Sequence, residues 1–185
     1  KCFFFSSLRF PTQFTEGYLY NNDGTKDIIS DLFAPAFVTS AWGVEYHPVD
    51  YFKVRIAPFA PRLTIVNDPA RFITSVGPTP YGVTPPDNTR WEWLAFQLQA
   101  DFNKDIAENI NLKWRYVLFA NYETLEANKI DHRLDLNLTA KVNDFINVGV
   151  GGILLYDYDQ DTGVQLSQGL TIGFAYSFRN YQEKK

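Results

Sequence analysis

The chain has 185 residues, a length typical of one domain, and 17% of them are aromatic. Its formal net charge of −4 argues against a general nucleic-acid binder, because neutralising phosphates requires an excess of Lys and Arg. The single cysteine, Cys2, excludes an intrachain disulfide and a zinc site with two thiolates, and two histidines are too few for a His-rich metal site. No apolar run of about 18 residues is present, which excludes a helical membrane protein but not a β-barrel, whose apolar residues alternate with polar ones.

Alternation of apolar and polar residues is the dominant pattern, and it predicts about eight antiparallel strands. We expect them at 1–10, 37–47, 51–66, 91–103, 109–122, 131–142, 146–157 and 165–178. In the clearest segment, from Arg133 to Val142, the even positions are apolar and the odd ones polar. Several segments exceed the roughly 5–6 residues usual in soluble sheets and match the roughly 9–11 that cross a bilayer. In the third segment the apolar residues change from even to odd positions near Pro58 and Pro61, which predicts a bulge or kink there.

The connections between these strands alternate in length. Tight turns are expected at 47–51, 103–109 and 142–145. Long loops are expected at 11–36 and 67–90, with shorter ones near 123–130 and 158–165. A short helical turn fits residues 23–33, whereas five prolines exclude helix and interior strand from the second long loop. Outer-membrane barrels show this asymmetry, with short periplasmic turns and longer external loops.

Aromatic residues recur where the strands end. At the short-turn ends are Tyr46, Phe52, Phe102, Phe145 and Phe178, and at the long-loop ends are Phe37, Trp91, Tyr122 and Tyr156. Two aromatic belts at the interfaces of a bilayer would produce this distribution. We therefore predict an all-β fold, an antiparallel transmembrane up-and-down β-barrel over residues 1–178, with a short periplasmic tail at 179–185. The predicted location is the bacterial outer membrane, with the lipid bilayer as a partner.

The polar faces of the predicted strands carry charges of both signs in mid-strand, and dry burial of such ions would cost several kcal/mol each unless they were paired. This lumen charge ladder consists of Lys53, Arg55, Asp101, Lys113, Arg115, Arg133, Asp135 and Lys141. It is either an anion-attracting wall or a set of cross-strand pairs that holds the register, and we favour the pairs because opposite charges lie on neighbouring strands. Facing residues of the last two strands are small, which leaves room for a plug, a loop or water.

The last strand resembles the assembly signal of bacterial outer-membrane proteins. A polar residue is followed by Gly173, and aromatic residues come later at alternate positions, Tyr176 and Phe178. The resemblance implies that the barrel-assembly machinery reads these three residues. The chain departs from the pattern because residues 179–185 follow the terminal Phe.

Short motifs along nearly the whole chain resemble, in their order, an uncharacterised outer-membrane β-barrel family of the Bacteroidota, a domain of unknown function. They are Phe10-Pro11-Thr12-Gln13-Phe14, Gly17-Tyr18, Ile29 to Ala36, Leu63 to Asp68, Asn103 to Ile106, Asn109-Ile110, Leu118 to Tyr122 and Leu155-Tyr156-Asp157. The resemblance implies further strands before Lys1 and a barrel of about twelve strands. It implies no activity, and eight strands can also close by themselves.

Two local patterns of polar residues suggest a catalytic pair and a metal site. Asp131 and His132 at the loop end of a strand suggest an acid–base pair, but neighbours on a strand point to opposite faces and cannot easily bond each other. Asp157, Asp159 and Asp161 alternate in a loop and are a weak calcium candidate, but the EF-hand spacing fails and we favour a solvated acidic turn. We therefore predict no catalytic residue, no metal and no cofactor.

The sequence predicts an integral outer-membrane barrel without catalysis. It would act as a structural component, as a partner subunit of an envelope complex with other outer-membrane proteins, or as a passive pore for small solutes. Two alternatives stay open: an outer-membrane enzyme with a rim site near His132 and Asp157, and a soluble lipocalin-like binder. A soluble sandwich would also show alternation, but it predicts extraction without detergent, whereas the barrel predicts dependence on detergent.

Overall fold

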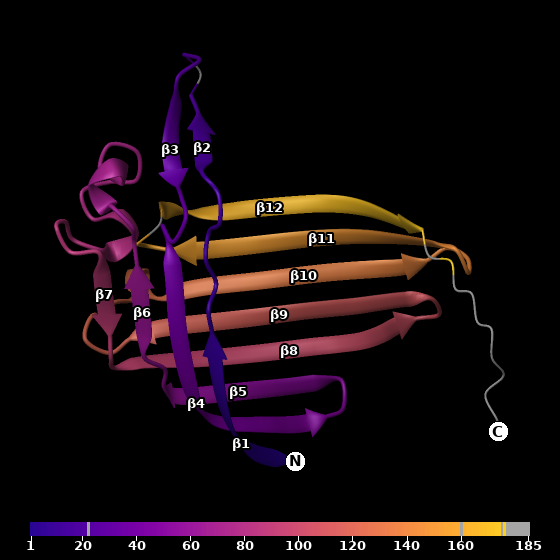
Figure 1. Ribbon diagram of the computed structural model, residues 1–185. Coiled ribbons are helices and arrows are strands. Elements are labelled where there is room, and N and C mark those ends of the chain that lie inside the picture. Colours follow the sequence, from indigo (N-terminus) through magenta and orange to yellow (C-terminus); the bar gives the residue numbers. More distant parts are fainter. Residues whose placement is uncertain (22, 160, 175, 177–185) are drawn as a thin grey trace.

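A computed structural model describes residues 1–21, 23–159, 161–174 and 176, with only the backbone of residues 161 and 162. The described chain is all-β and antiparallel, and its largest sheet is curled into a half-barrel (Figure 1). No helix in these residues is long and apolar enough to cross a membrane. The long strands are β1 (Cys2–Arg9), β4 (Ala36–Val49), β5 (Phe52–Phe59), β8 (Ala95–Ala107), β9 (Ile110–Asn121), β10 (Asp131–Lys141), β11 (Ile146–Asp157) and β12 (Asp161–Phe174).

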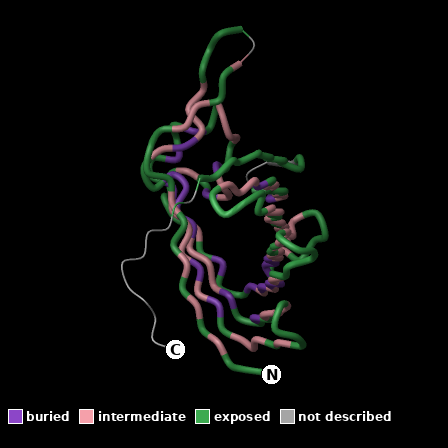
Figure 2. Tube along the Cα trace, turned by 90° about the vertical axis from the view of Figure 1, so that its right-hand side faces the viewer, coloured by how far each residue is buried: buried purple, intermediate pink, exposed green. Residues whose placement is uncertain are grey.

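These long strands follow one another in space as they do in the sequence. Starting from β1, each pairs antiparallel with the next, through β4, β5, β8, β9, β10 and β11 to β12. The antiparallel up-and-down order is therefore confirmed, and strands lie in each of the predicted segments, two of which are divided. Within the described residues β1 and β12 are the first and last of these long strands, and the curvature of the sheet is visible in Figure 2.

Strand β4 bends and divides its pairing between two partners. Its second half pairs with β5, and its first half pairs with β6 (Arg62–Ile65), which in turn pairs with β7 (Thr89–Glu92). The predicted kink near Pro58 and Pro61 is thus a complete break between two strands. Likewise, the predicted strand at 91–103 is divided into β7 and β8. We call the β6–β7 hairpin the β6–β7 arm; it stands at the loop ends of β8 to β11 (Figure 1).

The two long loops pack together into a unit of their own. The expected helical turn at 23–33 is wrong, because β2 (Gly17–Tyr20) and β3 (Lys26–Ser30) form a hairpin there. The second loop was expected to contain neither helix nor interior strand, but it has two short 3-10 helices, η1 (Pro69–Phe72) and η2 (Pro80–Gly82), each with a proline at its start. We call residues 17–30 and 66–83 the loop cap.

The largest fully buried apolar side chains of the described chain lie in this loop cap and not under the sheet. Phe72, Val66 and Val83 are each 0% exposed and pack with Ala34. Burial of a side chain as large as Phe72 contributes about 1.5–3 kcal/mol. The main apolar cluster of the sheet is built mostly of alanines, with Phe119 as its one large fully packed member. The sheet therefore has little conventional core on its concave side.

Candidate functional site

The convex face of the half-barrel is apolar and exposed. It presents the even-numbered residues of β9 to β12, which lie directly opposite one another in the register. Leu136 is 40% exposed, Leu170 68% and Ile172 70%, and Phe4 at the other edge is 93% exposed. A contiguous exposed apolar face of this extent marks contact with a membrane or another protein.

Aromatic rings group near both ends of the sheet. At the turn end, Trp114 stacks on Phe102 with centroids 5.7 Å apart and lies 5.9 Å from Phe52. At the loop end, Trp91 and Trp93 stack at 4.6 Å and are both about half exposed. The distribution agrees with the predicted belts at these positions.

One predicted belt residue, Phe37, is placed differently. Its ring lies 5.9 Å from the Arg62 guanidinium and lines the concave face. Phe37 is an odd-numbered residue of β4, and alternation along the strand puts it on the face opposite to the exposed Trp42. Phe37 therefore lies at the loop end of its strand, as predicted, with its ring on the inside.

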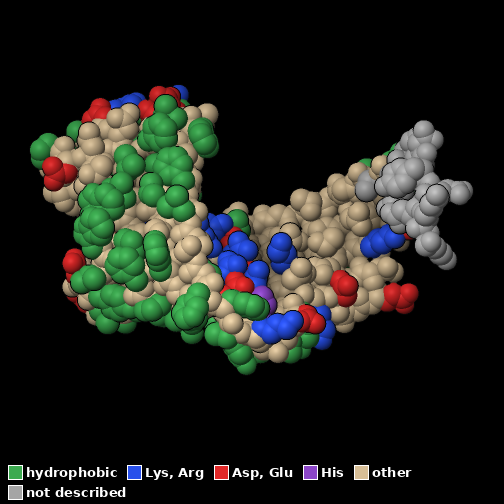
Figure 3. Space-filling model, turned by 60° about the horizontal axis from the view of Figure 1, so that its bottom comes forward, with side chains coloured by type: hydrophobic (Ala, Val, Ile, Leu, Met, Phe, Trp, Pro, Cys, Tyr) green, Lys and Arg blue, Asp and Glu red, His purple; other side chains and the backbone are tan. Residues whose placement is uncertain are grey.

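The concave face is polar and charged, as Figure 3 shows along the hollowed middle of the molecule. At its centre, Arg115 donates from Nε to Asp101 at 2.5 Å across the β8–β9 pair. Asp101 also accepts a hydrogen bond of 2.5 Å from Gln99, which is 1% exposed and bonded to Arg9. Lys53 lies opposite Asp101 in the register. These residues tie strands β1, β5, β8 and β9 together.

The remaining members of the lumen charge ladder pair in other ways. Arg133 binds Asp135 on its own strand, with contacts of 2.7 and 2.9 Å, and not across strands as the sequence predicted. Lys141 pairs at 2.6 Å with Asp144 in the following turn. Arg55 pairs with Glu45 on β4. The ladder is thus a mixture of cross-strand, same-strand and turn contacts, and its functional role stays a prediction.

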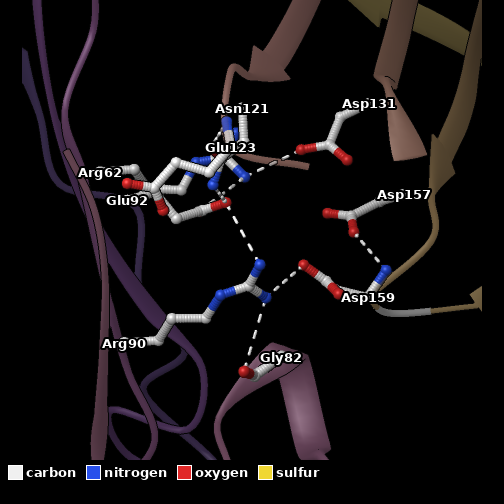
Figure 4. A network of polar contacts seen from close by, with 9 residues as sticks. All are labelled: Arg62, Gly82, Arg90, Glu92, Asn121, Glu123, Asp131, Asp157 and Asp159. Carbon is white, nitrogen blue, oxygen red and sulfur yellow. Dashed lines mark hydrogen bonds and ion pairs between the residues drawn. The ribbon is translucent and has the colours of Figure 1, made fainter. Parts of the chain in front are cut away.

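A second group of charges, which the sequence did not reveal, lies where the β6–β7 arm faces the loop ends of β10 and β11 (Figure 4). We call it the charged cluster; its members are Arg62, Arg90, Glu92, Asp131 and Asp159. Arg62 lies 2.8 Å from Asp131 and 3.9 Å from Glu92, and Arg90 lies 2.6 Å from Asp159 and 3.5 Å from Glu92. Two arginines of one arm therefore hold a carboxylate of β10, Asp131, and one in the turn after β11, Asp159.

The charged cluster is most removed from solvent around Glu92, whereas Asp159 is 40% exposed. The side chain of Glu92 is 6% exposed, and it accepts a further hydrogen bond of 3.1 Å from Asn121. The Arg62 guanidinium also lies 3.3 Å from the centroid of the Phe119 ring. A cavity of about 230 Å³ adjoins Arg90, Glu92 and Asp131. Pairing keeps these buried ions in place, because an unpaired buried charge is strongly destabilising.

The structure places His132 and Asp157 on neighbouring strands, where both line the concave hollow, and His132 lies opposite Tyr156 in the register. The His132 ring lies between Tyr116 and Tyr156, and its Nδ1 is 2.7 Å from the Tyr116 hydroxyl oxygen. Asp157 lines the concave face, and its carboxylate accepts the backbone N–H of Asp159 at 3.1 Å. Asp131, the sequence neighbour of His132, bonds to Arg62 instead. The alternating register thus separates Asp131 from His132.

The weak calcium candidate is only partly described. The carboxylate of Asp159 is paired with Arg90, and the side chain of Asp161 lies outside the described residues. No group of three or more His, Cys, Asp or Glu side chains arranged for a metal is found among the residues that the structure describes.

The predicted assembly signal is also described only in part. Gly173 lies in β12 opposite Asn147, and the Tyr176 ring stacks on Phe145 with centroids 6.3 Å apart. Phe178 and the predicted tail at 179–185 lie outside the described residues.

Tyr81 and Asp31, one in each long loop, have shifted pKa values. Burial raises the pKa of Tyr81 from 10.0 to about 12, and its hydroxyl donates to the Ile29 carbonyl. Hydrogen bonds from the backbone N–H of Leu32 and from Arg71 lower the pKa of Asp31. Both groups connect the two long loops, so they link the cohesion of this region to pH.

The fold and its two faces define a class, an all-β protein with an antiparallel half-barrel that is polar inside and apolar outside. No family model matches the chain, and no curated protein or solved structure matches it either. The interpretation of the site therefore depends on the residues of this chain.

Proposed function

We propose that this chain forms part of the wall of an outer-membrane β-barrel without catalytic activity. In this proposal the convex face contacts lipid, and the concave face lines a hydrated lumen through which small solutes pass. The observation that carries the proposal is the direction of the two faces: large apolar side chains on the outside and ion pairs on the inside. A soluble barrel such as a lipocalin would direct its apolar face inward.

Strand length and aromatic placement support the same proposal. Strands β8 to β12 have 11 to 14 residues, more than the roughly 9–11 that cross a bilayer. Aromatic rings lie near both ends of the sheet, where lipid headgroups would meet them. Membership in the Bacteroidota family of unknown function remains part of the proposal.

Two adjacent residues of β10 provide the sharpest test. Adjacent residues of a strand point to opposite faces, so Leu136 belongs to the convex face and Asn137, opposite Lys113, to the concave face. We would replace the single cysteine by serine, introduce Leu136→Cys or Asn137→Cys into the full-length protein, and reconstitute each variant into liposomes. A charged, water-soluble maleimide should label the Asn137→Cys protein and leave the Leu136→Cys protein unlabelled until the membrane is dissolved and the protein unfolded.

Two further measurements complete the test. The protein should need detergent for extraction and should change its gel mobility on boiling. Equal labelling of both variants in liposomes, or extraction without detergent, would contradict the membrane role. Conductance across a planar bilayer then tests the pore. Embedded protein without conductance would favour the structural or partner-subunit role.

A further inference from the structure

A hollow of about 640 Å³ lies on the concave face over strands β9 to β12. One row of residues crosses its floor, each paired with the next across the sheet: Lys113, Asn137, Gly151 and Gly169. Directly opposed residues of antiparallel strands point to the same face. An ammonium group and an amide group therefore stand beside two positions that have no side chain.

Packing within the described part of the chain does not require glycine at those two positions. A Cβ at Gly169 would meet no heavy atom within 4 Å, and one at Gly151 would meet only the Leu136 carbonyl oxygen, at 3.8 Å. Glycine in a strand interior is otherwise unfavourable, because it adds backbone entropy to the unfolded chain and packs against nothing. The two glycines keep the hollow open beside the cations.

The hollow is also basic, although the whole chain is acidic. Lys113, Arg115 and Arg133 line it, together with the single carboxylate of Asp135. Arg133 is engaged by Asp135, and Arg115 donates its Nε to Asp101, so the two terminal amino groups of Arg115 lie outside that contact. Among the described residues, no carboxylate lies within ion-pair distance of Lys113.

We propose that this hollow binds a small organic anion, a carboxylate or a phosphate ester, with Lys113 and Arg115 as the cationic contacts. Asn137, Ser167 and Thr171 supply further hydrogen-bonding groups around it. Its volume falls in the range of about 300–1,000 Å³ that is usual for small-molecule sites. A guanidinium suits both anions because its planar fork matches two oxygens. The inference rests on the proposed function, since it names the class of solute that the lumen receives.

Calorimetric titration of the full-length protein in detergent at low ionic strength tests the site, with inorganic phosphate and succinate as separate probes. Saturable binding is expected for at least one of them, and the probe that binds identifies the preferred oxygen geometry. Lys113→Gln should weaken binding about tenfold or more, the effect of losing one charge-assisted hydrogen bond. Gly169→Val should abolish binding without changing any charge, because its side chain occupies the floor.

The matched control is Lys53→Gln. Lys53 carries the same charge on the same face but lies on β5, outside the hollow. Its replacement should change affinity less than about twofold, since screening by water and salt weakens a distant charge. Gel mobility before and after boiling verifies that each variant is folded.

Either of two results would overturn the site: no saturable binding of phosphate or succinate to folded protein, or equal weakening by the Lys53 and Lys113 replacements. Cysteine labelling on the same preparation separates this inference from the proposed function. If Leu136→Cys is protected in liposomes and neither anion binds, only the anion site is wrong. If Leu136→Cys is labelled in liposomes and an anion still binds, the membrane role is wrong and the site stands.

Discussion

Replacement of Arg62 by methionine should destabilise the loop end of the sheet more than any surface change. The Arg62 Nη1 atom lies 2.8 Å from Asp131 and 3.9 Å from Glu92, and the guanidinium lies over the Phe119 ring. Methionine keeps the length and the apolar stem but removes the charge and its donors. Arg62→Met therefore leaves two carboxylates, 6% and 19% exposed, without this cation.

The expected cost is about 3–5 kcal/mol, the usual effect of removing one partner from a buried ion pair. The double variant Arg62→Met/Asp131→Asn should recover part of this loss, because it removes one of the orphaned charges. Lys129→Gln is the control. Lys129 pairs with Glu126 at 3.0 Å, and both side chains are much more exposed, so its loss should cost less than about 1 kcal/mol.

Hydrogen exchange of the β6–β7 arm, read by mass spectrometry, is the appropriate measurement, because the arm can open while the rest of the sheet stays folded. A loss of 3 kcal/mol corresponds to exchange about 100-fold faster. Urea unfolding followed by tryptophan fluorescence gives the global free energy for comparison. If Arg62→Met accelerates exchange of the arm no more than Lys129→Gln does, the charged cluster does not hold the arm and the reasoning fails.

Three further changes test other parts of the structure. Gly43→Ala should prevent normal pairing of β4 with β5, because the added Cβ would collide with the β5 backbone. Gly151→Ala should leave strand pairing unchanged, because its Cβ has room. The change in gel mobility on boiling reports the folding of both variants. Tyr81→Phe should cost the loop cap about 1 kcal/mol by removing the bond to the Ile29 carbonyl. In the parent protein, absorbance at alkaline pH should show Tyr81 ionising near pH 12, with its contribution to stability lost as pH rises above 10.0. The ionised Asp31 carboxylate stabilises the folded loops at pH values above 3.8, its ordinary pKa, and this stabilisation disappears as pH falls through the lowered pKa of the folded protein. Asp31→Asn should therefore reduce the acid sensitivity of proteolysis in the loops.

The strands and their two faces could be predicted because alternation is a local property. Successive residues of a strand point to opposite sides whatever the neighbouring strands are. The segment from Arg133 to Val142 therefore indicates its apolar and polar faces without information on any other strand. The same reasoning explains why Asp131 and His132 do not meet. The divided pairing of β4 was not predictable, because it depends on which strands reach its two halves.

The charged cluster was invisible in the sequence for a different reason. Arg62 and Asp131 are 69 residues apart, and no spacing or motif links them. Their contact requires the β6–β7 arm to fold toward the ends of β10 and β11. The ladder pairs show the same limit: charge and face were predicted, but the choice of Asp135 as the partner of Arg133 depends on side-chain geometry within one strand.

By itself the sequence determined that the sheet has one apolar and one polar face, since side-chain alternation follows from the covalent geometry of an extended chain. Only the tertiary structure decided that the polar face is concave, because curvature arises from twist accumulated over many paired strands and from the bend in β4. Curvature also decided which residues share a hollow. Lys113, Asn137, Gly151 and Gly169 become neighbours through the register of four strands, a long-range property that no local pattern contains.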